Sequence, residues 1–268
     1  MRRVARALVL LASVFPLALV PGVAPAQAPV ATWVLEGVND RFCVSYLVEP
    51  GQAAEILGSR FTGVAAERVE GLHPAVAQVV SSEPAFRSWV PAEICVIDAG
   101  RVSSGQRVAS EGGRSVILGY SALAAMPAGG GSPAMRASVF STSGSLRRLA
   151  SDQLIHVDGF KYAKGTVPDG TDQRRSIDYE GATLTWVGRI LEPSGTPAPR
   201  ALTLATDGKR NRALAGNLSE AAAWERATVG NLRVQGKSDL ARALIASPIR
   251  MVGPVTGGGS ISVEWSLR

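Results

Sequence analysis

The chain contains few side chains that could catalyse a reaction, beginning with only two histidines, His73 and His156. Two histidines exclude a three-histidine metal site, and the sequence has no HExxH motif. His156 and Asp158 are two positions apart in a segment that we predict to be a strand, so both would face the same side. There they could act as an acid–base pair, or they could be ordinary polar residues of an edge or surface strand. His73 precedes Pro74, a pattern typical of a loop or a helix entrance.

Other catalytic and cofactor motifs are absent from the sequence. The run Gly119–Leu123 lacks the second glycine of a nucleophile elbow, and no serine lies three residues before any of the four lysines. The glycine-rich runs do not join a strand to a helix, as a phosphate-binding loop requires. We therefore expect no cofactor and no metal ion, and this absence of motifs favours a protein that is not an enzyme.

One aromatic residue is a candidate for ligand binding. Trp186 lies in the run Thr183–Leu191, where it alternates with polar residues and shares one face with Leu184 and Ile190. Inside a barrel its ring could form a platform for a ligand, or it could simply fill the core.

The two cysteines, Cys43 and Cys95, both lie in strand-like runs. An even pair in an oxidising compartment indicates one disulfide, closing a loop of about 50 residues that would stabilise the fold by about 4 kcal/mol. The alternative is two buried free thiols.

Alternation of apolar and polar residues with period two predicts most of the secondary structure as strands. Three runs alternate clearly, namely 41–49, 183–191 and 261–268. Four other runs look like strands buried on both faces: 93–99, 116–125, 154–162 and 201–206.

Helices are predicted to be few and short. Expected helices are Gln52–Leu57, one beginning at Pro74, Ala221–Ala227 after a capping box of Asn217 and Glu220, and Asp239–Ala246. These elements predict an α+β, strand-dominated fold: mostly antiparallel sheet, curled or closed into a barrel, with a few short outer helices. We expect a single β-rich domain over residues 27–268, with looser segments near 127–133 and 192–200.

The N-terminus has the pattern of a cleaved secretory signal peptide. Three arginines at positions 2, 3 and 6 precede an apolar run over 7–20, and small residues surround Ala26. The run has about 14 residues, too few to span a bilayer that needs roughly 20. We expect cleavage after Ala26 by the general secretory route, and hence a periplasmic or secreted protein without a stable membrane span.

Charge excludes nucleic acid as a partner. The signal carries three of the charges in the net +6 of the full chain, so the remaining 242 residues carry +3. The arginine pairs at 147–148 and 174–175 are isolated, whereas a nucleic-acid interface needs a continuous basic surface.

The segment Phe42–Leu57, FCVSYLVEPGQAAEIL, resembles the opening of acetoacetate-decarboxylase-like domains, with a strand, a proline and a short helix. The runs Ile94–Gly100 and Ala182–Leu191 are compatible with the curled barrel of that family. The resemblance implies an enclosed apolar pocket for a small organic acid or ketone. The family's working residue is a lysine beside a second lysine, which forms a Schiff base. No two lysines are adjacent here, so the resemblance carries a fold and a pocket without that mechanism.

Three functions follow as hypotheses. The first is an exported, soluble protein that binds a small apolar or amphipathic ligand in a barrel-like domain. The second is an extracytoplasmic enzyme with an unrecognised acid–base site, for which His156 and Asp158 are the candidates. The third is an envelope or surface interaction protein without a small ligand, whose protein partners the sequence does not identify.

Overall fold

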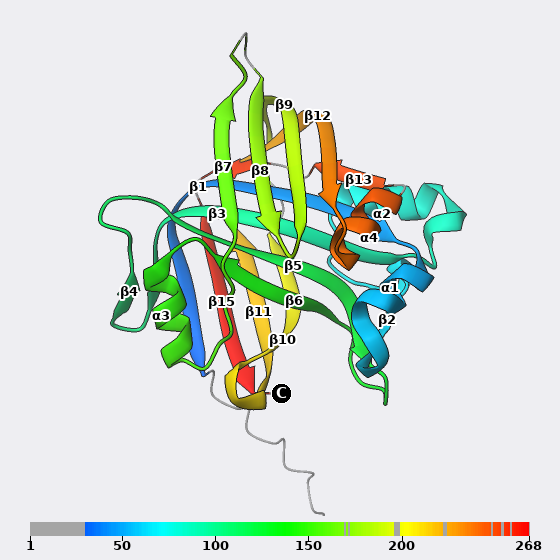
Figure 1. Ribbon diagram of the computed structural model, residues 1–268, viewed down its shortest axis with the longest axis horizontal. Helices are drawn as coiled ribbons and strands as arrows, with labels where there is room; N and C mark the ends of the chain where they lie inside the picture. The colour runs from blue at the N-terminus through cyan, green and yellow to red at the C-terminus, as the bar shows by residue number, and fades with distance from the viewer. Residues whose placement is uncertain are drawn as a thin grey trace, which may run out of the picture.

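The computed structural model describes residues 30–267 apart from positions 169, 171, 196–198, 222–223, 248, 253–254 and 258 (Figure 1). The predicted signal peptide, residues 1–26, lies outside this part of the chain. Within the described residues, no helix combines the length and apolar character needed to cross a membrane.

A closed ring of strands forms the centre of the molecule. The order β3-β5-β6-β10-β11-β15-β1 closes because β1 also pairs with β3. The pairs are antiparallel, except that β6 and β10 pair in parallel at Met135–Leu204 and Arg136–Ala205. The ring strands are β1 (Ala31–Val48), β3 (Val90–Ser104), β5 (Val116–Pro127), β6 (Ala134–Ser141), β10 (Arg200–Asp207), β11 (Ala213–Ala221) and β15 (Ser260–Leu267).

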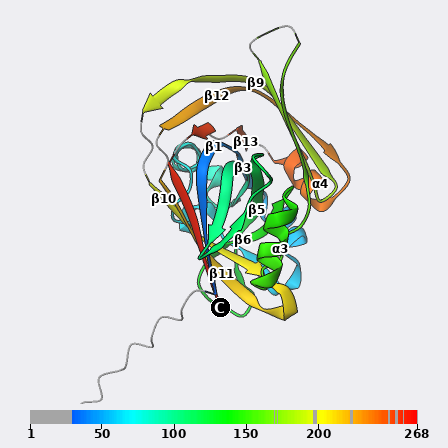
Figure 2. The same ribbon diagram turned by 90° about the vertical axis from the view of Figure 1, so that its left-hand side faces the viewer.

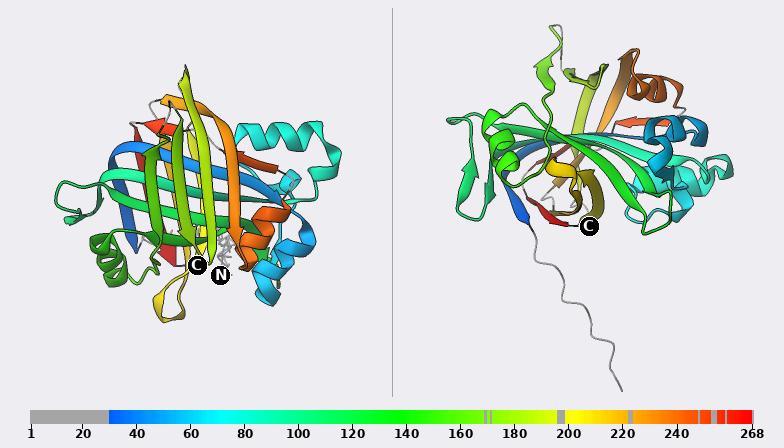
Figure 3. Two further views of the ribbon diagram at one scale, coloured as in Figure 1. Left: turned by 45° about the horizontal axis from the view of Figure 1, so that its top comes forward. Right: turned by 60° about the horizontal axis from the view of Figure 1, so that its bottom comes forward.

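A second, outer sheet extends from β1 and crosses over the ring. Its strands follow the order β1-β14-β12-β9-β8-β7, and Figure 3 shows β7, β8, β9 and β12 passing over β1, β3 and β5. The outer strands are β7 (Lys161–Thr166), β8 (Gln173–Tyr179), β9 (Ala182–Gly195), β12 (Trp224–Gly236) and β14 (Val255–Gly257). Three shorter strands pair elsewhere: β2 (Phe61–Gly63) with β5, β4 (Arg107–Ala109) with β3, and β13 (Ile249–Val252) with β1.

Short helices lie at the margins of the two sheets (Figure 2). They are α1 (Pro50–Leu57), α2 (Pro74–Ser82), α3 (Gly144–Asp152) and α4 (Asp239–Ala246). Side chains cap three of them: the His73 ring accepts a hydrogen bond from Ala75 N, and the Ser143 and Ser238 hydroxyls accept from the third residue of α3 and α4. Local sequence signals therefore fix where these helices begin.

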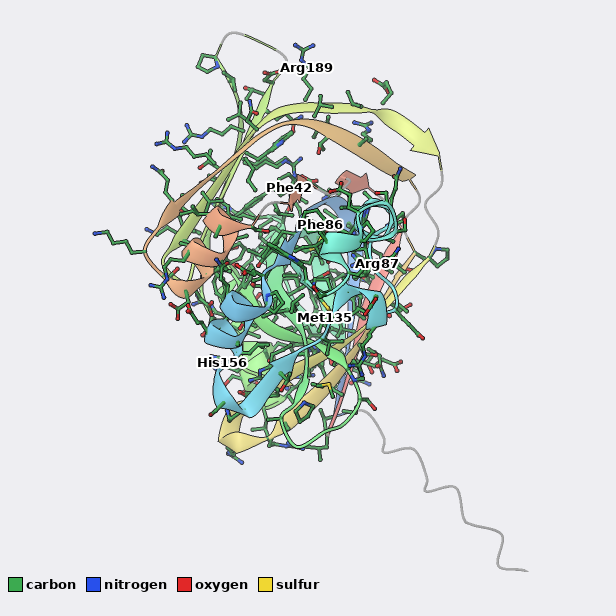
Figure 4. The ribbon with its side chains drawn as sticks, turned by 90° about the vertical axis from the view of Figure 1, so that its right-hand side faces the viewer. Phe42, Phe86, Arg87, Met135, His156 and Arg189 are labelled. Atoms are coloured by element: carbon green, nitrogen blue, oxygen red, sulfur yellow. A yellow bond between two sulfur atoms is a disulfide. The ribbon has the colours of Figure 1, made fainter. Side chains whose placement is uncertain are left out.

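Strand β1 is buried on both faces from Asp40 to Val48, because the outer sheet covers one face and the ring encloses the other. Phe42 packs against Trp186 of β9, with ring centroids 5.5 Å apart, and Figure 4 shows Phe42 beneath the outer sheet that carries Arg189. A bulge interrupts the pairing with β3 between Val38 and Asp40. Gly37, just before it, has φ +61°, a conformation that favours glycine.

The strand-dominated barrel predicted from the sequence is confirmed, including the strands at 41–49, 93–99, 116–125, 183–191 and 201–206. Two element predictions are wrong. The segment 154–162 makes one isolated bridge, between Asp158 and Phe140, and a strand begins only at Lys161. The expected helix 221–227 is replaced by the end of β11 and the beginning of β12, and Glu220 is a strand residue instead of a capping residue. Helix α3 was not predicted.

Candidate ligand-binding site

A fully buried carboxylate, Glu93 of β3, is the centre of a polar cluster inside the ring. The Arg200 guanidinium donates from Nη1 to Glu93 Oε1 (3.1 Å) and from Nη2 to Oε2 (2.9 Å). The Tyr120 hydroxyl donates to Oε1 (2.5 Å) and the Ser45 hydroxyl to Oε2 (3.2 Å). Both oxygens are thus saturated, as a charge that is only 3% exposed requires.

A second ion pair continues the cluster across the ring. Arg41 of β1 lies 3.1 Å from Glu220 Oε1 on β11, and 3.6 Å from Glu93 Oε1. Strands β1 and β11 are not neighbours, because β15 lies between them. Their side chains meet across β15, and because these side chains are only 4% and 5% exposed, the cluster lies in the interior.

The cluster contains as many cations as anions, and these opposite charges shift the pKa values of Glu93 and Arg200. Burial alone would raise the pKa of Glu93, but Arg200 and Arg41 outweigh burial and lower it to about 2. Burial opposes the charge of Arg200 as well, and Glu93 outweighs it, so the pKa of Arg200 is raised. Burial is the first cause that raises the pKa of the Tyr120 hydroxyl, followed by the Glu93 charge. Tyr120 therefore remains a neutral donor.

A cleft opens in the wall of the ring where β6 and β10 separate. The two strands pair only at Met135–Leu204 and Arg136–Ala205. Beyond that contact a cleft of about 790 Å³ lies between the start of β6, the strands β10 and β11, and the loop 68–71. Its walls include Met135, Leu202 and Leu218.

The inner end of this cleft reaches the charge cluster. Four residues of the cleft, Val69, Gly71, Met135 and Leu202, also line a small cavity bounded by Glu93, Arg200 and His73. The small cavity measures about 10 Å³, roughly the room that one water molecule occupies. A ligand in the cleft would therefore have its innermost atoms beside the cluster.

His73 is one of the residues that line this inner end. Its Nδ1 accepts a hydrogen bond from Ala75 N (3.3 Å), so the neutral ring carries its proton on Nε2. Nε2 is buried and has no partner among the described residues. Burial, and secondly the charge of Arg200, lower the pKa of His73 and favour the neutral ring.

A separate buried cluster joins the outer sheet to β1. Arg175 of β8 donates to Asp40 Oδ2 (2.7 Å), and the ammonium of Lys164 of β7 lies 2.9 Å from the same oxygen. Tyr162 is 3.3 Å from Arg175 Nη1, and Asp98 is 4.0 Å from Lys164. Because Asp40 and Asp98 are directly opposite in the β1–β3 register, two cations between them offset their repulsion.

The lysines do not reach the inside of the ring. All four, at positions 161, 164, 209 and 237, are solvent-exposed. Lys164 is the one that contacts a buried acid, and it does so from the outer sheet with 44% of its side chain exposed. Neither the cleft nor the small cavity has a lysine in its lining.

The structure brings His156 and Asp158 together, with Nε2 and Oδ1 2.8 Å apart. Their side chains are 54% and 44% exposed, and neither lines the cleft or the small cavity. In Figure 4, His156 lies well apart from Met135 of the cleft. The pair is therefore a surface feature, and a catalytic role for it stays a prediction.

Trp186 is fully buried between the outer sheet and β1. Two glycines leave room for its ring, since a Cβ at Gly188 or Gly230 would lie within 2.8 Å of the indole. It lines neither the cleft nor the small cavity and packs against Phe42 in the core, and a role as a ligand platform stays a prediction.

Cys43 and Cys95 form a disulfide between directly opposite positions of β1 and β3. Among the described residues, one group of side chains lies close enough together to hold a metal ion, and it consists of these two cysteines and Glu93. Both sulfurs are engaged in the disulfide, so this group offers no thiolate to an ion.

Sequence reasoning missed the charge cluster because its members lie on five strands. Arg41, Glu93, Tyr120, Arg200 and Glu220 become neighbours only when the ring closes. One signal existed: Glu93 interrupts the apolar run 90–97, where a strand buried on both faces has no place for an unpaired charge.

Comparisons with known proteins agree with this architecture. A scan against models of protein families and a search of curated proteins find no match for the sequence. Among solved structures, the chain is similar to an acetoacetate decarboxylase from Legionella pneumophila, with a TM-score of 0.52, 10% identity and coverage of 93% of each chain.

Two further solved structures are similar to the chain with lower TM-scores. The enduracididine biosynthesis enzyme MppR, complexed with pyruvate, has a TM-score of 0.48 and 13% identity over 94% of this chain and 93% of its own. An acetoacetate decarboxylase-like enzyme from Sphingomonas wittichii RW1 has a TM-score of 0.45 and 10% identity over 91% of this chain and 93% of its own. The similarity to the Legionella structure, at 10% identity, is a similarity of fold. The chain therefore has the fold of the acetoacetate-decarboxylase-like barrel, the family that its sequence resembles.

Proposed function

We propose that the protein binds a small amphipathic molecule in the cleft between β6 and β10. One observation carries the proposal: a cleft of about 790 Å³, whose walls include Met135, Leu202 and Leu218, leads to the Glu93–Arg200 pair and to His73, whose buried Nε2 has no partner within the described part of the chain. Its volume lies within the range of about 300–1,000 Å³ that is typical of small-molecule sites.

The lining defines the chemistry of the ligand. Met135, Leu202 and Leu218 offer apolar contact to its body. At the inner end the polar groups of His73 and Arg200 are donors, because Glu93 already accepts four hydrogen bonds. The ligand therefore carries an apolar part and an acceptor oxygen, as in a carbonyl or carboxylate, directed at His73 Nε2–H.

The described residues that line the cleft favour binding without turnover. It contains neither a lysine nor a cysteine that could act as a nucleophile, and Glu93 is held as an anion by its cations, so it is a poor proton carrier near neutral pH. We also propose that the chain is exported, on the strength of residues 1–26.

A fluorescent ketone tests the proposal without knowledge of the natural ligand. Prodan is a neutral naphthalene with a propionyl carbonyl, and its emission shifts to the blue when it leaves water. We expect saturable binding to the wild-type protein, and at least a tenfold loss of affinity in Thr203→Trp, because Thr203 is an exposed cleft residue whose enlargement fills the cleft.

The matched control is Val108→Trp, which adds the same ring at an exposed position of β4. It should bind prodan like the wild type. Equal binding by Thr203→Trp and the wild type would place the probe outside the cleft and contradict the proposal.

A further inference from the structure

A second cleft lies on the opposite side of the β6–β10 contact. It measures about 660 Å³, and its lining includes Arg60, Phe61, Arg136, Asp207 and Leu214. Arg136 pairs with Ala205 at the contact itself, so the two clefts occupy the two ends of one parallel junction. The residues of this second cleft take no part in the site described above.

Two arginines in the second cleft converge on a single carboxylate. Arg136 donates to Asp207 Oδ2, and Arg60 Nη2 lies 3.4 Å from the same oxygen. Asp207 Oδ2 is the one acidic oxygen that these two guanidiniums reach among the described residues. One anion for two cations leaves an excess of positive charge in the cleft.

Arg136 is held in place by an aromatic ring. Its guanidinium carbon lies 4.1 Å from the centroid of the Phe61 ring, and that of Arg60 lies 5.8 Å from it. The side chain of Arg136 is only 22% exposed, whereas that of Arg60 is 75% exposed. Stacking fixes the plane of Arg136, and a fixed guanidinium loses less entropy when it binds an oxyanion.

The neighbouring turn adds to the positive field. It joins β10 to β11 directly after Asp207 and carries Lys209, Arg210 and Arg212. Lys209 donates to the Ser151 hydroxyl (2.8 Å), so the turn is anchored beside the cleft. A local excess of cations around a partly apolar cleft attracts small anions.

We propose that this second cleft binds a small organic oxyanion with an aromatic or apolar part. Its carboxylate or phosphate would take the Arg136 and Arg60 donors that Asp207 now occupies, and its apolar part would lie over Phe61 and Leu214. The inference does not depend on the ligand of the first cleft.

Calorimetric titration of the whole chain tests this with three probes of similar shape. Benzoate and phenyl phosphate carry the oxyanion, and benzamide is the neutral control. We expect measurable binding of at least one of the two anions and at least tenfold weaker binding of benzamide, since charge-assisted hydrogen bonds are the strong ones. The tighter of the two anions identifies the head group.

Two substitutions should act in opposite directions. Arg136→Gln should weaken anion binding at least tenfold, whereas Asp207→Asn should strengthen it severalfold, because it frees both arginines from their internal competitor. Arg101→Gln, which removes an exposed arginine from a Glu36 pair elsewhere on the surface, should change nothing.

Thr203→Trp should leave anion binding intact, which separates this cleft from the first one. Unfolding midpoints confirm that each variant is folded. The proposal is overturned if neither anion binds more tightly than benzamide, or if Asp207→Asn binds the anion more weakly than the wild type.

Discussion

Inside the ring of strands, Arg200 donates a hydrogen bond from each of its two terminal nitrogens to Glu93, 3.1 and 2.9 Å from the two carboxylate oxygens. Glu93 is on β3 and Arg200 begins β10, and three strand-to-strand pairings lie between them along the ring. A pair in this position ties opposite walls together and also forms the inner end of the cleft. It therefore has consequences for stability as well as for binding.

The first prediction concerns Glu93→Gln. Removing the anion leaves Arg200 without its carboxylate partner and leaves Arg41 with Glu220 alone, so the free energy of unfolding should fall by about 3 kcal/mol at neutral pH. Urea denaturation measures this loss, and Glu49→Gln, at an exposed position before α1, is the matched control.

The loss should depend on pH in a defined window. The pKa of Glu93 falls from an ordinary value of 4.5 to about 2 in the folded protein. Its stabilising contribution is complete above pH 4.5 and declines as the pH falls toward 2, because the unfolded chain takes up the proton first. The difference between wild type and Glu93→Gln should therefore shrink across this window. A difference that stays constant from pH 5 to pH 2 would show that Glu93 is not held as an anion.

The link between the outer sheet and the ring gives a second prediction. Arg175 and Lys164 both contact Asp40 Oδ2, but the side chain of Arg175 is 2% exposed and that of Lys164 is 44% exposed. Arg175→Met should lower the free energy of unfolding by about 3 kcal/mol, whereas Lys164→Met should lower it by less than about 1 kcal/mol. Equal losses from the two substitutions in urea denaturation would contradict the burial that separates them.

The third prediction concerns the disulfide. Cys43 and Cys95 are 52 positions apart, and cross-linking a loop of that length stabilises a fold by about 4 kcal/mol in the chain-entropy model. The double variant Cys43→Ala/Cys95→Ala should unfold with a free energy lower by about that amount. Adding a reductant should destabilise the wild type and leave the double variant unchanged; a wild type indifferent to reductant would argue that the bond does not form in the isolated protein.

Export is tested by mass. If the signal peptide is cleaved after Ala26, the protein recovered outside the cytoplasm begins at Gln27, and intact mass spectrometry should find 242 residues. Replacing Ala24 and Ala26 by larger residues should block cleavage and retain the full-length mass. Recovery of uncleaved chain in the cytoplasm from the unaltered gene would contradict this expectation.

Local patterns were enough to predict the strands but not every boundary. The runs around Phe42 and Trp265 alternate with period two, and a strand with one apolar face needs no information from elsewhere. The alanine-rich segment after Glu220 has helical propensity, yet β11 pairs with β10 up to Glu220 and with β15 up to Ala221, and β12 pairs with β14 from Trp224 onward. Long-range pairing therefore overrides a local helix signal.

The site was less accessible to sequence reasoning. The candidates chosen from the sequence, His156 and Asp158, were selected for residue type and spacing, and the structure places them on the surface. The clefts arise from the end of a two-residue parallel contact between β6 and β10, and strand pairing of this kind leaves no local trace. A charge such as Glu93 inside an apolar run is the one feature that could have indicated a polar interior.

Binding in the cleft can be checked by native mass spectrometry of protein recovered from its own cells without refolding. We expect an excess mass of one small molecule that disappears on denaturation, is absent from Thr203→Trp and is retained by Val108→Trp. A bare mass for the wild-type protein, or the same bound mass in Thr203→Trp, would contradict binding in the cleft and favour an interaction protein or an enzyme acting elsewhere on the chain.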